Sequence, residues 1–128
     1  MKTLKTILLS LFIAASIGAV STSVLAESDP GRIVYKPADA IDMVVAKIQV
    51  AIEAISKGAS GDEAAALIKE ASDASKEINA NDKVDNARSK ANRKLKTAIK
   101  HAKESALQEA EQELRDAKKE FEALKGLL

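Results

Sequence analysis

Apolar residues recur at spacings of three and four along most of the chain after residue 36, which is the pattern of amphipathic helices. Turn-forming residues interrupt the pattern twice, at residues 58–61 and 79–82. Twenty alanines follow residue 26, and only 2% of the residues are aromatic. Alanine has the highest helix propensity, whereas strands favour β-branched and aromatic residues, so the sequence predicts an all-α fold.

Two interruptions and one inferred break divide the pattern into four helices. The first helix is expected over residues 37–57 and the second over residues 62–78, because turn-forming residues follow each of them. Residues 83–125 contain neither glycine nor proline. We place a break near Glu104, which divides this stretch into a third and a fourth helix. A single continuous rod is the alternative. Short connections between such helices predict a small antiparallel four-helix bundle over residues 37–128.

Local signals indicate where two of these helices begin and what they bury. Ser60 with Glu63, and Ser105 with Gln108, have the spacing of a capping box, in which each partner bonds the other's backbone N–H. We therefore expect these serines to precede the second and fourth helices. The first helix is apolar on two faces, so we expect it to be the most buried. The predicted stripe of the second helix is Ala64, Leu67, Ala71, Ala74 and Ile78.

The two predicted helix pairs have similar lengths, which suggests a duplicated helical hairpin. Residues 55–78 align with residues 99–121 when one residue is dropped near Gly61, and the alignment rests on a few identities. A background rich in alanine and lysine also produces such matches by chance, so both explanations stay open.

Residues 1–26 have the order of a secretory signal peptide. A basic start with Lys2 and Lys5 precedes an apolar run, and Val24 and Ala26 place short side chains at the positions that a signal peptidase reads. The run of about 14 residues is too short to span about 30 Å of hydrocarbon. We therefore predict cleavage after Ala26 and export to the periplasm.

The predicted mature chain starts with a short lead-in. Residues 27–36 contain a turn-forming cluster around Pro30 and are expected to be irregular. The chain has no cysteine, so a lipid-anchored signal, disulfide bonds and thiolate metal sites are excluded. No stable membrane insertion is expected after cleavage.

Charge is distributed unequally among the predicted helices. Residues 83–103 contain eight lysines and arginines against Asp85 alone, whereas residues 62–82 and residues 104–122 each have a net charge of −4. In an up-down bundle the third helix packs beside both acidic helices, so we expect ion pairs between them. The alternative is a face that binds phosphate, nucleic acid or acidic lipid. Nucleic acid is the least expected of these, because no aromatic or glycine-rich element accompanies the lysines.

The residues that could carry catalysis are few. His101 is the single histidine and there is no cysteine, so neither a His/Cys nucleophile pair nor a structural zinc site can form. No segment resembles a nucleophile elbow or a glycine-lined oxyanion hole. We therefore predict that the protein is not an enzyme.

Four carboxylates recur at steps of four, three and four along one face of the predicted fourth helix. Such oxygen ligands suit calcium, magnesium or manganese, and tight sites need about six to eight of them converging on the ion. The alternative is a solvated acidic face. The candidate ligands of a divalent metal ion are Glu109, Glu113, Asp116 and Glu120, together with His101.

One stretch of the chain resembles the family of small periplasmic metal-binding proteins, most clearly over residues 95–120. Members of that family are four-helix bundles whose repeated units carry many histidines and bind divalent metals such as copper. The resemblance implies the same fold, and it makes His101 the position that matches a ligand histidine. The matching residues are Ala98-Ile99-Lys100-His101-Ala102-Lys103-Glu104 and Leu107-Gln108-Glu109-Ala110-Glu111.

These observations leave three classes of function. The leading expectation is a non-catalytic periplasmic bundle that binds divalent cations weakly through acidic helix faces. The first alternative is a structural protein that docks an envelope partner, or a second copy of itself, through a helix face. The second alternative is anion or nucleic-acid binding by the basic third helix.

Overall fold

The computed structural model describes residues 34–128, which form one compact unit. The predicted signal peptide and residues 27–33 of the predicted lead-in lie outside the described residues. Within the described residues, all four helices contribute to one apolar core.

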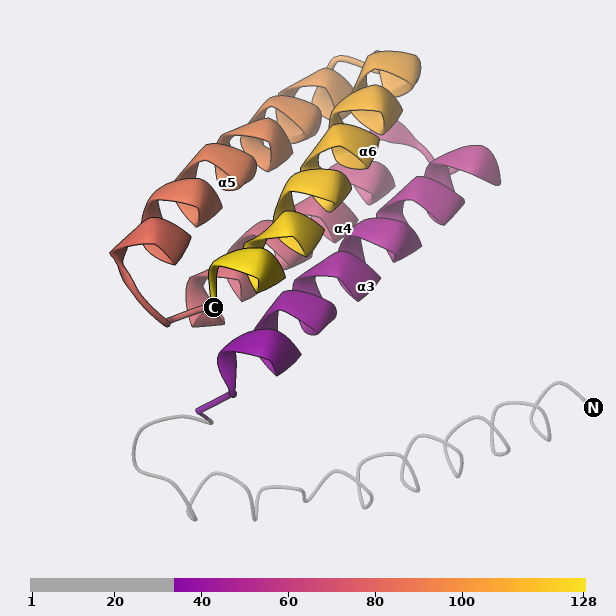
Figure 1. Ribbon diagram of the computed structural model, residues 1–128. Coiled ribbons are helices and arrows are strands. Elements are labelled where there is room, and N and C mark those ends of the chain that lie inside the picture. The colour runs from indigo at the N-terminus through magenta and orange to yellow at the C-terminus, as the bar shows by residue number, and fades with distance from the viewer. Residues whose placement is uncertain (1–33) are drawn as a thin grey trace, which may run out of the picture. The chain divides into compact units, whose positions relative to one another are not determined.

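Four α-helices and two short 3₁₀ turns make up this unit. They are α3 (Pro37–Ser56), α4 (Gly61–Ala74), α5 (Asp82–Lys103) and α6 (Leu107–Ala123), with 3₁₀ turns at Ser75–Glu77 and Leu124–Leu127. Consecutive helices run in opposite directions (Figure 1). Both α3 and α5 contact α4 and α6, so α3 and α5 occupy opposite corners. The predicted antiparallel four-helix bundle is confirmed, and the described part of the chain contains no strand.

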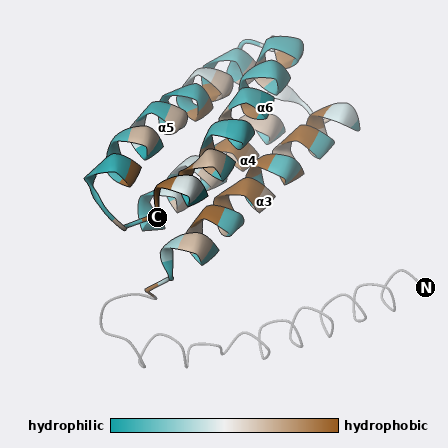
Figure 2. Ribbon diagram, viewed as in Figure 1, coloured by the Kyte–Doolittle hydropathy of each residue, from teal (hydrophilic) through white to brown (hydrophobic). Residues whose placement is uncertain are grey.

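The core forms where the apolar stripes of the four helices meet, and Figure 2 shows these stripes in brown. About half of the core residues are alanines, whose small side chains let helix axes approach closely. Each larger apolar side chain that is fully buried contributes about 1.5–3 kcal/mol. The largest of them are Phe121, Ile41, Ile48, Ile68, Leu95, Leu114 and Leu124.

The prediction that the first helix is the most buried is confirmed only in part, because α3 has the smallest share of exposed residues but α4 has a larger share of buried ones. The inner face of α3 is fully buried at Ile41 and Ile48, but Val50 on its second apolar face is 52% exposed. Six of the 20 residues of α3 are buried, against six of the 14 residues of α4. Because α3 sits at a corner with two neighbouring helices, its other side faces solvent.

α4 differs from the predicted helix in its stripe and in its end. Ile68 is fully buried, whereas Leu67, which the stripe included, is only half-buried. The helix ends at Ala74 and tightens into a 3₁₀ turn, in which the Ser75 hydroxyl donates to the Ser72 carbonyl oxygen at 2.6 Å. Ile78 is extended and not helical, but its side chain is buried.

The start of α4 is a capping box, as predicted. The Glu63 backbone N–H donates to the Ser60 hydroxyl at 3.1 Å, and the Ser60 backbone N–H donates to the Glu63 carboxylate at 3.1 Å. The pKa of Glu63 is lowered mainly by the hydrogen bond from the Ser60 backbone N–H and, to a smaller extent, by the one with the Ser60 hydroxyl. The next residue, Gly61, lies so close to the Ala102 carbonyl of α5 that an added Cβ would overlap it.

The break between the third and fourth helices is confirmed near Glu104, because α5 ends at Lys103 and α6 begins at Leu107. The predicted capping box at this break is wrong. Ser105 adopts a left-handed conformation with φ of 62°, and Ala106 takes the N-cap position without a side-chain hydrogen bond. By contrast, α5 is capped by Asn81, whose side chain accepts from the Val84 N–H at 2.9 Å.

Within residues 34–128, none of the helices combines the length and the hydropathy that a membrane span requires.

Candidate functional site

The five predicted metal ligands lie on two neighbouring helices. His101 is in the last turn of α5 and is half-buried, while the four carboxylates are spread along α6. Each carboxylate of Glu109, Glu113, Asp116 and Glu120 precedes a residue of the buried stripe, so the four lie on the flank of α6 and not on its outermost face. Because the four carboxylates follow one another along a single helix, their oxygens do not converge on one ion.

No three of the His, Asp and Glu side chains in residues 34–128 come together in a way that could hold a metal ion. Two of the candidate ligands already have other partners. Glu120 pairs with Lys94 of α5 at 3.6 Å, and Asp116 accepts from the Gln112 amide at 3.2 Å. The predicted cation site therefore has no supporting geometry here, and cation binding stays a prediction.

The ion pairs expected between α5 and both of its neighbours are largely missing. Among the described residues, Lys94 with Glu120 is the one pair that joins α5 to α6, and no ion pair joins α5 to α4. Arg88 pairs within its own helix, with Asp85. The prediction that acids of the neighbouring helices neutralise the third helix therefore holds only for Lys94 among its eight cations, and six of the eight have no ion-pair partner in the described part of the chain.

Five of these six cations share one face of α5, which we call the basic ridge. The buried stripe of α5 follows Ala91, Leu95, Ala98 and Ala102, and the ridge lies on the solvent side of the helix. All five ridge side chains are exposed, and none has an ion-pair partner in the described part of the chain. The ridge consists of Lys90, Arg93, Lys96, Lys100 and Lys103.

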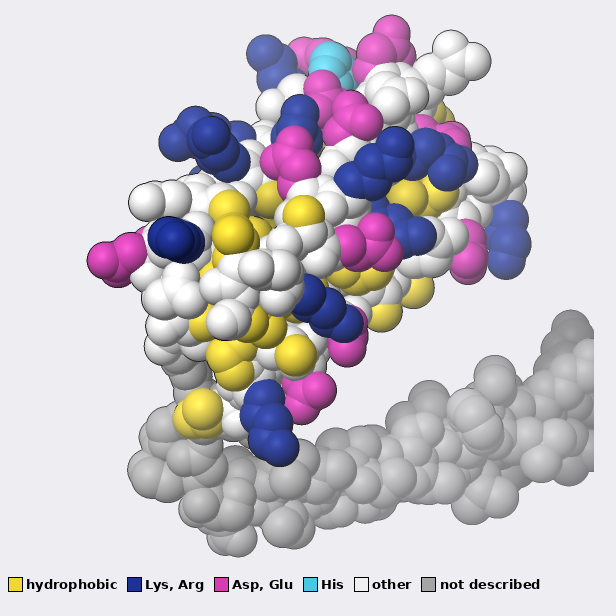
Figure 3. Space-filling model, viewed as in Figure 1, with side chains coloured by type: hydrophobic (Ala, Val, Ile, Leu, Met, Phe, Trp, Pro, Cys, Tyr) yellow, Lys and Arg dark blue, Asp and Glu magenta, His cyan; other side chains and the backbone are white. Residues whose placement is uncertain are grey.

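The surface around the ridge is uneven in charge. In Figure 3, Lys and Arg side chains follow the edge of the molecule where α5 lies, whereas both signs of charge are mixed over α6. On α6, Arg115 donates to the Glu111 carboxylate through two of its nitrogens. From residue 86 to residue 103, α5 contains no acidic residue.

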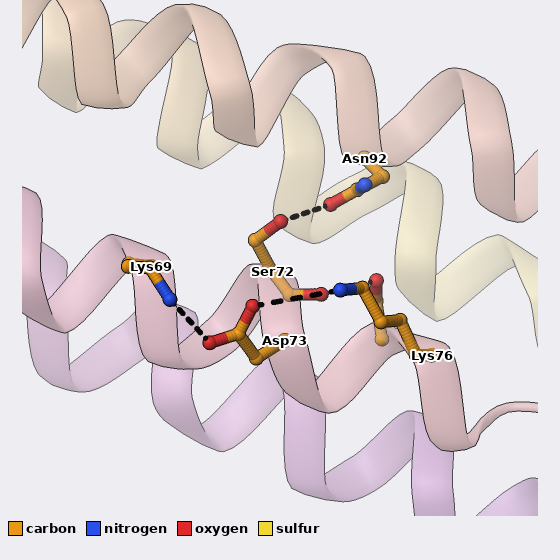
Figure 4. A network of polar contacts seen from close by, with 6 residues as sticks. Lys69, Ser72, Asp73, Lys76 and Asn92 are labelled. Carbon is orange, nitrogen blue, oxygen red and sulfur yellow. Dashed lines mark hydrogen bonds and ion pairs between the residues drawn. The ribbon is translucent and has the colours of Figure 1, made fainter.

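Beside their apolar packing, α4 and α5 are joined by a hydrogen bond between two uncharged polar side chains, which the sequence pattern did not reveal. The Ser72 hydroxyl donates to the Asn92 side-chain oxygen at 2.6 Å (Figure 4). Lys69 and Lys76 lie beside this contact and pair with Asp73 at 2.8 Å and 3.9 Å. The hydrogen bond from Lys69 lowers the pKa of Asp73 and raises that of Lys69. Lys69 of α4 and Lys76 of the following 3₁₀ turn thus share one acidic partner, whereas the ridge cations have none in the described part of the chain.

The surface hollows in residues 34–128 offer no catalytic constellation. A hollow of about 580 Å³ lies at one end of the bundle and is mostly apolar, with Lys36 as its one titratable side chain. A second, of about 320 Å³, lies between α3 and α6 and contains Arg115, Lys118 and Lys119 beside Glu122. Lys118 there donates to the Gln49 side chain at 3.0 Å, which joins the two helices. Neither hollow contains a histidine or a serine that could act as a nucleophile or base.

Comparison with known proteins finds no matching family, no matching characterised relative and no matching solved structure.

Proposed function

We propose that this protein is a non-catalytic helical bundle that binds polyanions through the basic ridge of α5. The observation that carries the proposal is the lack of ion-pair partners for five exposed cations on one helix face. Charged groups that stabilise a fold are usually paired or form networks. A row of unpaired charges of one sign supports a role in recognition instead.

Repulsion between neighbouring cations of the ridge lowers the stability of the middle part of α5. Lys90 with Arg93, Arg93 with Lys96, and Lys96 with Lys100 are like-charge neighbours three or four residues apart. Each such pair destabilises a helix by about 0.2–0.5 kcal/mol. Lys100 and Lys103 lie in the last turn, where cations are favoured by the helix dipole. The first three ridge cations have no such structural reason.

The charge of the other helices also favours α5 as the face that binds a negative partner. α5 carries eight cations and two acids, while α3, α4 and α6 each carry more acids than cations. The bundle therefore has a positive corner at α5 opposite an acidic corner at α3. This asymmetry would orient the molecule with α5 towards a negative partner during encounter.

The other expectations from the sequence have less support. Cation binding by α6 and docking of an envelope protein remain predictions, and no specific arrangement of the described residues favours either. Export to the periplasm and the absence of enzymatic activity are part of our proposal and rest on the sequence alone.

Heparin affinity provides a direct test of this function. We expect the protein to be retained on immobilised heparin and to elute earlier when Arg93→Gln and Lys96→Gln are combined. A matched control removes the same charge elsewhere, with Lys57→Gln at the end of α3 and Lys119→Gln on α6. Retention should fall steeply with salt, because polyanion binding releases counterions. Equal elution of the two double variants would refute a role for the ridge.

A further inference from the structure

We propose that the polyanion is the surface of an anionic phospholipid bilayer, on which α5 lies flat. This inference rests on the proposed function and names its partner. It follows from the shape of the ridge, from the chemistry of its side chains, and from where the exposed apolar and acidic residues lie.

The ridge has the shape of a surface contact. Its five cations lie within residues 90–103 of one helix, and the first and last are about 20 Å apart along the helix axis at the rise of an α-helix. None of the ridge residues lines either of the hollows described above. A convex row without a pocket cannot enclose a small anion, but it can lie along an extended array of negative charges.

The side chains of the ridge favour headgroups over bases. Four of the five are lysines, whose ammonium groups act as compact point charges on flexible stems. Base edges of double-stranded nucleic acid are recognised by arginine or lysine at guanine and by asparagine or glutamine at adenine, and the ridge contains neither asparagine nor glutamine. Thr97 lies between the ridge cations, and its hydroxyl donates to the Arg93 backbone carbonyl at 3.0 Å, so this donor is already engaged within the helix. No phenylalanine, tyrosine or tryptophan occurs in α5 for stacking on bases.

The rest of the bundle fits this orientation. Val50, an exposed apolar residue of α3, lies at the corner opposite α5 and would face away from the bilayer. The acids of α3, Asp39, Asp42 and Glu53, would face away as well. The ridge itself has no apolar side chain to insert, so binding is electrostatic, reversible and sensitive to salt. Predicted export would place the protein beside membrane surfaces and away from nucleic acid.

Vesicle binding tests this proposal. The protein beginning at Glu27, which contains the whole bundle and lacks the apolar run, is sedimented with vesicles of phosphatidylcholine plus phosphatidylglycerol or of phosphatidylcholine alone. We expect binding to the mixed vesicles only. Each cation near an anionic surface contributes about a fivefold gain in affinity, so combined Arg93→Gln and Lys96→Gln should weaken binding about 25-fold. Combined Lys57→Gln and Lys119→Gln should change it less than about threefold. Circular dichroism verifies that each variant is folded.

Two further measurements distinguish failure of the membrane proposal from failure of polyanion binding itself. Double-stranded DNA is titrated in the same buffer by fluorescence anisotropy, and heparin retention is measured in parallel. Retention on heparin without binding to mixed vesicles, or tighter binding to DNA than to mixed vesicles, would overturn the membrane as partner and leave polyanion binding intact. No binding to heparin, vesicles or DNA would overturn both. Equal binding to the two kinds of vesicle would show that lipid charge is not recognised.

Discussion

α5 and α6 are neighbouring antiparallel helices that resemble each other inside and differ outside. Both bury a stripe in which alanines flank one leucine, Leu95 in α5 and Leu114 in α6, and each stripe has one further large apolar residue, Val84 or Phe121. On the solvent side, α6 mixes acids and cations and holds Arg115 against Glu111. α5 instead shows solvent a row of cations without partners.

Comparing the two helices shows that the fold requires their buried stripes but does not require a particular charge on their outer faces. The buried stripes account for the docking of both helices, because the hydrophobic contribution of a stripe does not depend on the charges behind it. α6 shows that this bundle tolerates an outer face with balanced charge. The charge of α5 is therefore not a requirement of the architecture, which agrees with the proposed role of this helix in binding polyanions.

The inner faces of the two helices should be equivalent. Leu95→Ala and Leu114→Ala each remove a fully buried side chain, so each should lower the free energy of unfolding by about 2–5 kcal/mol. Urea denaturation followed by circular dichroism gives the values. A loss below about 1 kcal/mol at one of the two leucines would break the comparison, because that helix would not depend on its stripe.

The ends of the two helices should differ. Gly61→Ala would push a Cβ against the Ala102 carbonyl near the end of α5, and should cost about 1–3 kcal/mol. Gly126→Ala, beyond the end of α6, meets nothing within 4 Å and is the matched control. Its effect should be neutral or slightly stabilising. Similar thermal melts for the two variants would mean that α4 does not approach α5 as closely as described.

The starts of the two helices also differ. Asn81→Ala removes the cap of α5 and should lower the free energy of unfolding by about 1 kcal/mol. Asn81→Asp keeps the accepting oxygen and should retain most of that stability. α6 has no side-chain cap to lose at Ala106. If Asn81→Ala were as stable as the wild type in urea, the start of α5 would be no better fixed than that of α6.

The outer faces should respond to charge removal in opposite directions. Combined Arg93→Gln and Lys96→Gln relieves repulsion, so stability should stay equal or rise by up to about 1 kcal/mol, and more at low salt than at about 0.1 M salt. Arg115→Gln breaks the pair with Glu111 and should lose about 0.3–0.5 kcal/mol. Thermal melts at two salt concentrations measure both. A loss in the α5 variant would reveal intramolecular partners for the ridge.

Divalent cations should have the smallest effect. Because the acids of α6 form no cluster with His101, calcium, manganese or copper should leave the melting temperature nearly unchanged. A clear rise with calcium or manganese that disappears when Glu109, Glu113 and Asp116 are neutralised together would establish an acidic site on α6. A rise with copper that His101→Ala abolishes would instead support the metal chemistry of the resembled family.

Much of the fold could be predicted because it depends on local pattern. The helical period, the turn-forming residues and the capping box at Ser60 each involve residues within a few positions of one another. The break near Glu104 was predicted, but the wrong residues were expected to cap it. Ser105 has the right spacing to Gln108, but the chain reverses direction there through a left-handed residue, which leaves Ala106 at the cap. That reversal is set by how α5 and α6 pack.

Less of the candidate site could be predicted. The charge of α5 is plain in the sequence, and so is its alternative role as an anion-binding face. The sequence could not show that Lys94 would find Glu120 while Arg93 and Lys96 would find nothing. It also gave no sign that Ser72 and Asn92 would join α4 to α5 in place of an ion pair.

By itself, the sequence determined that residues 34–128 form four helices and that one of these carries eight of the chain's 20 lysines and arginines, because both properties are sums over neighbouring residues. The tertiary structure alone decided which charges are neutralised and which apolar side chains are buried. Val50 and Ile68 have similar hydropathy, but one faces solvent and the other the core, because each helix meets only two neighbours. An ion pair needs two side chains within about 4 Å, and only the register between packed helices sets that distance.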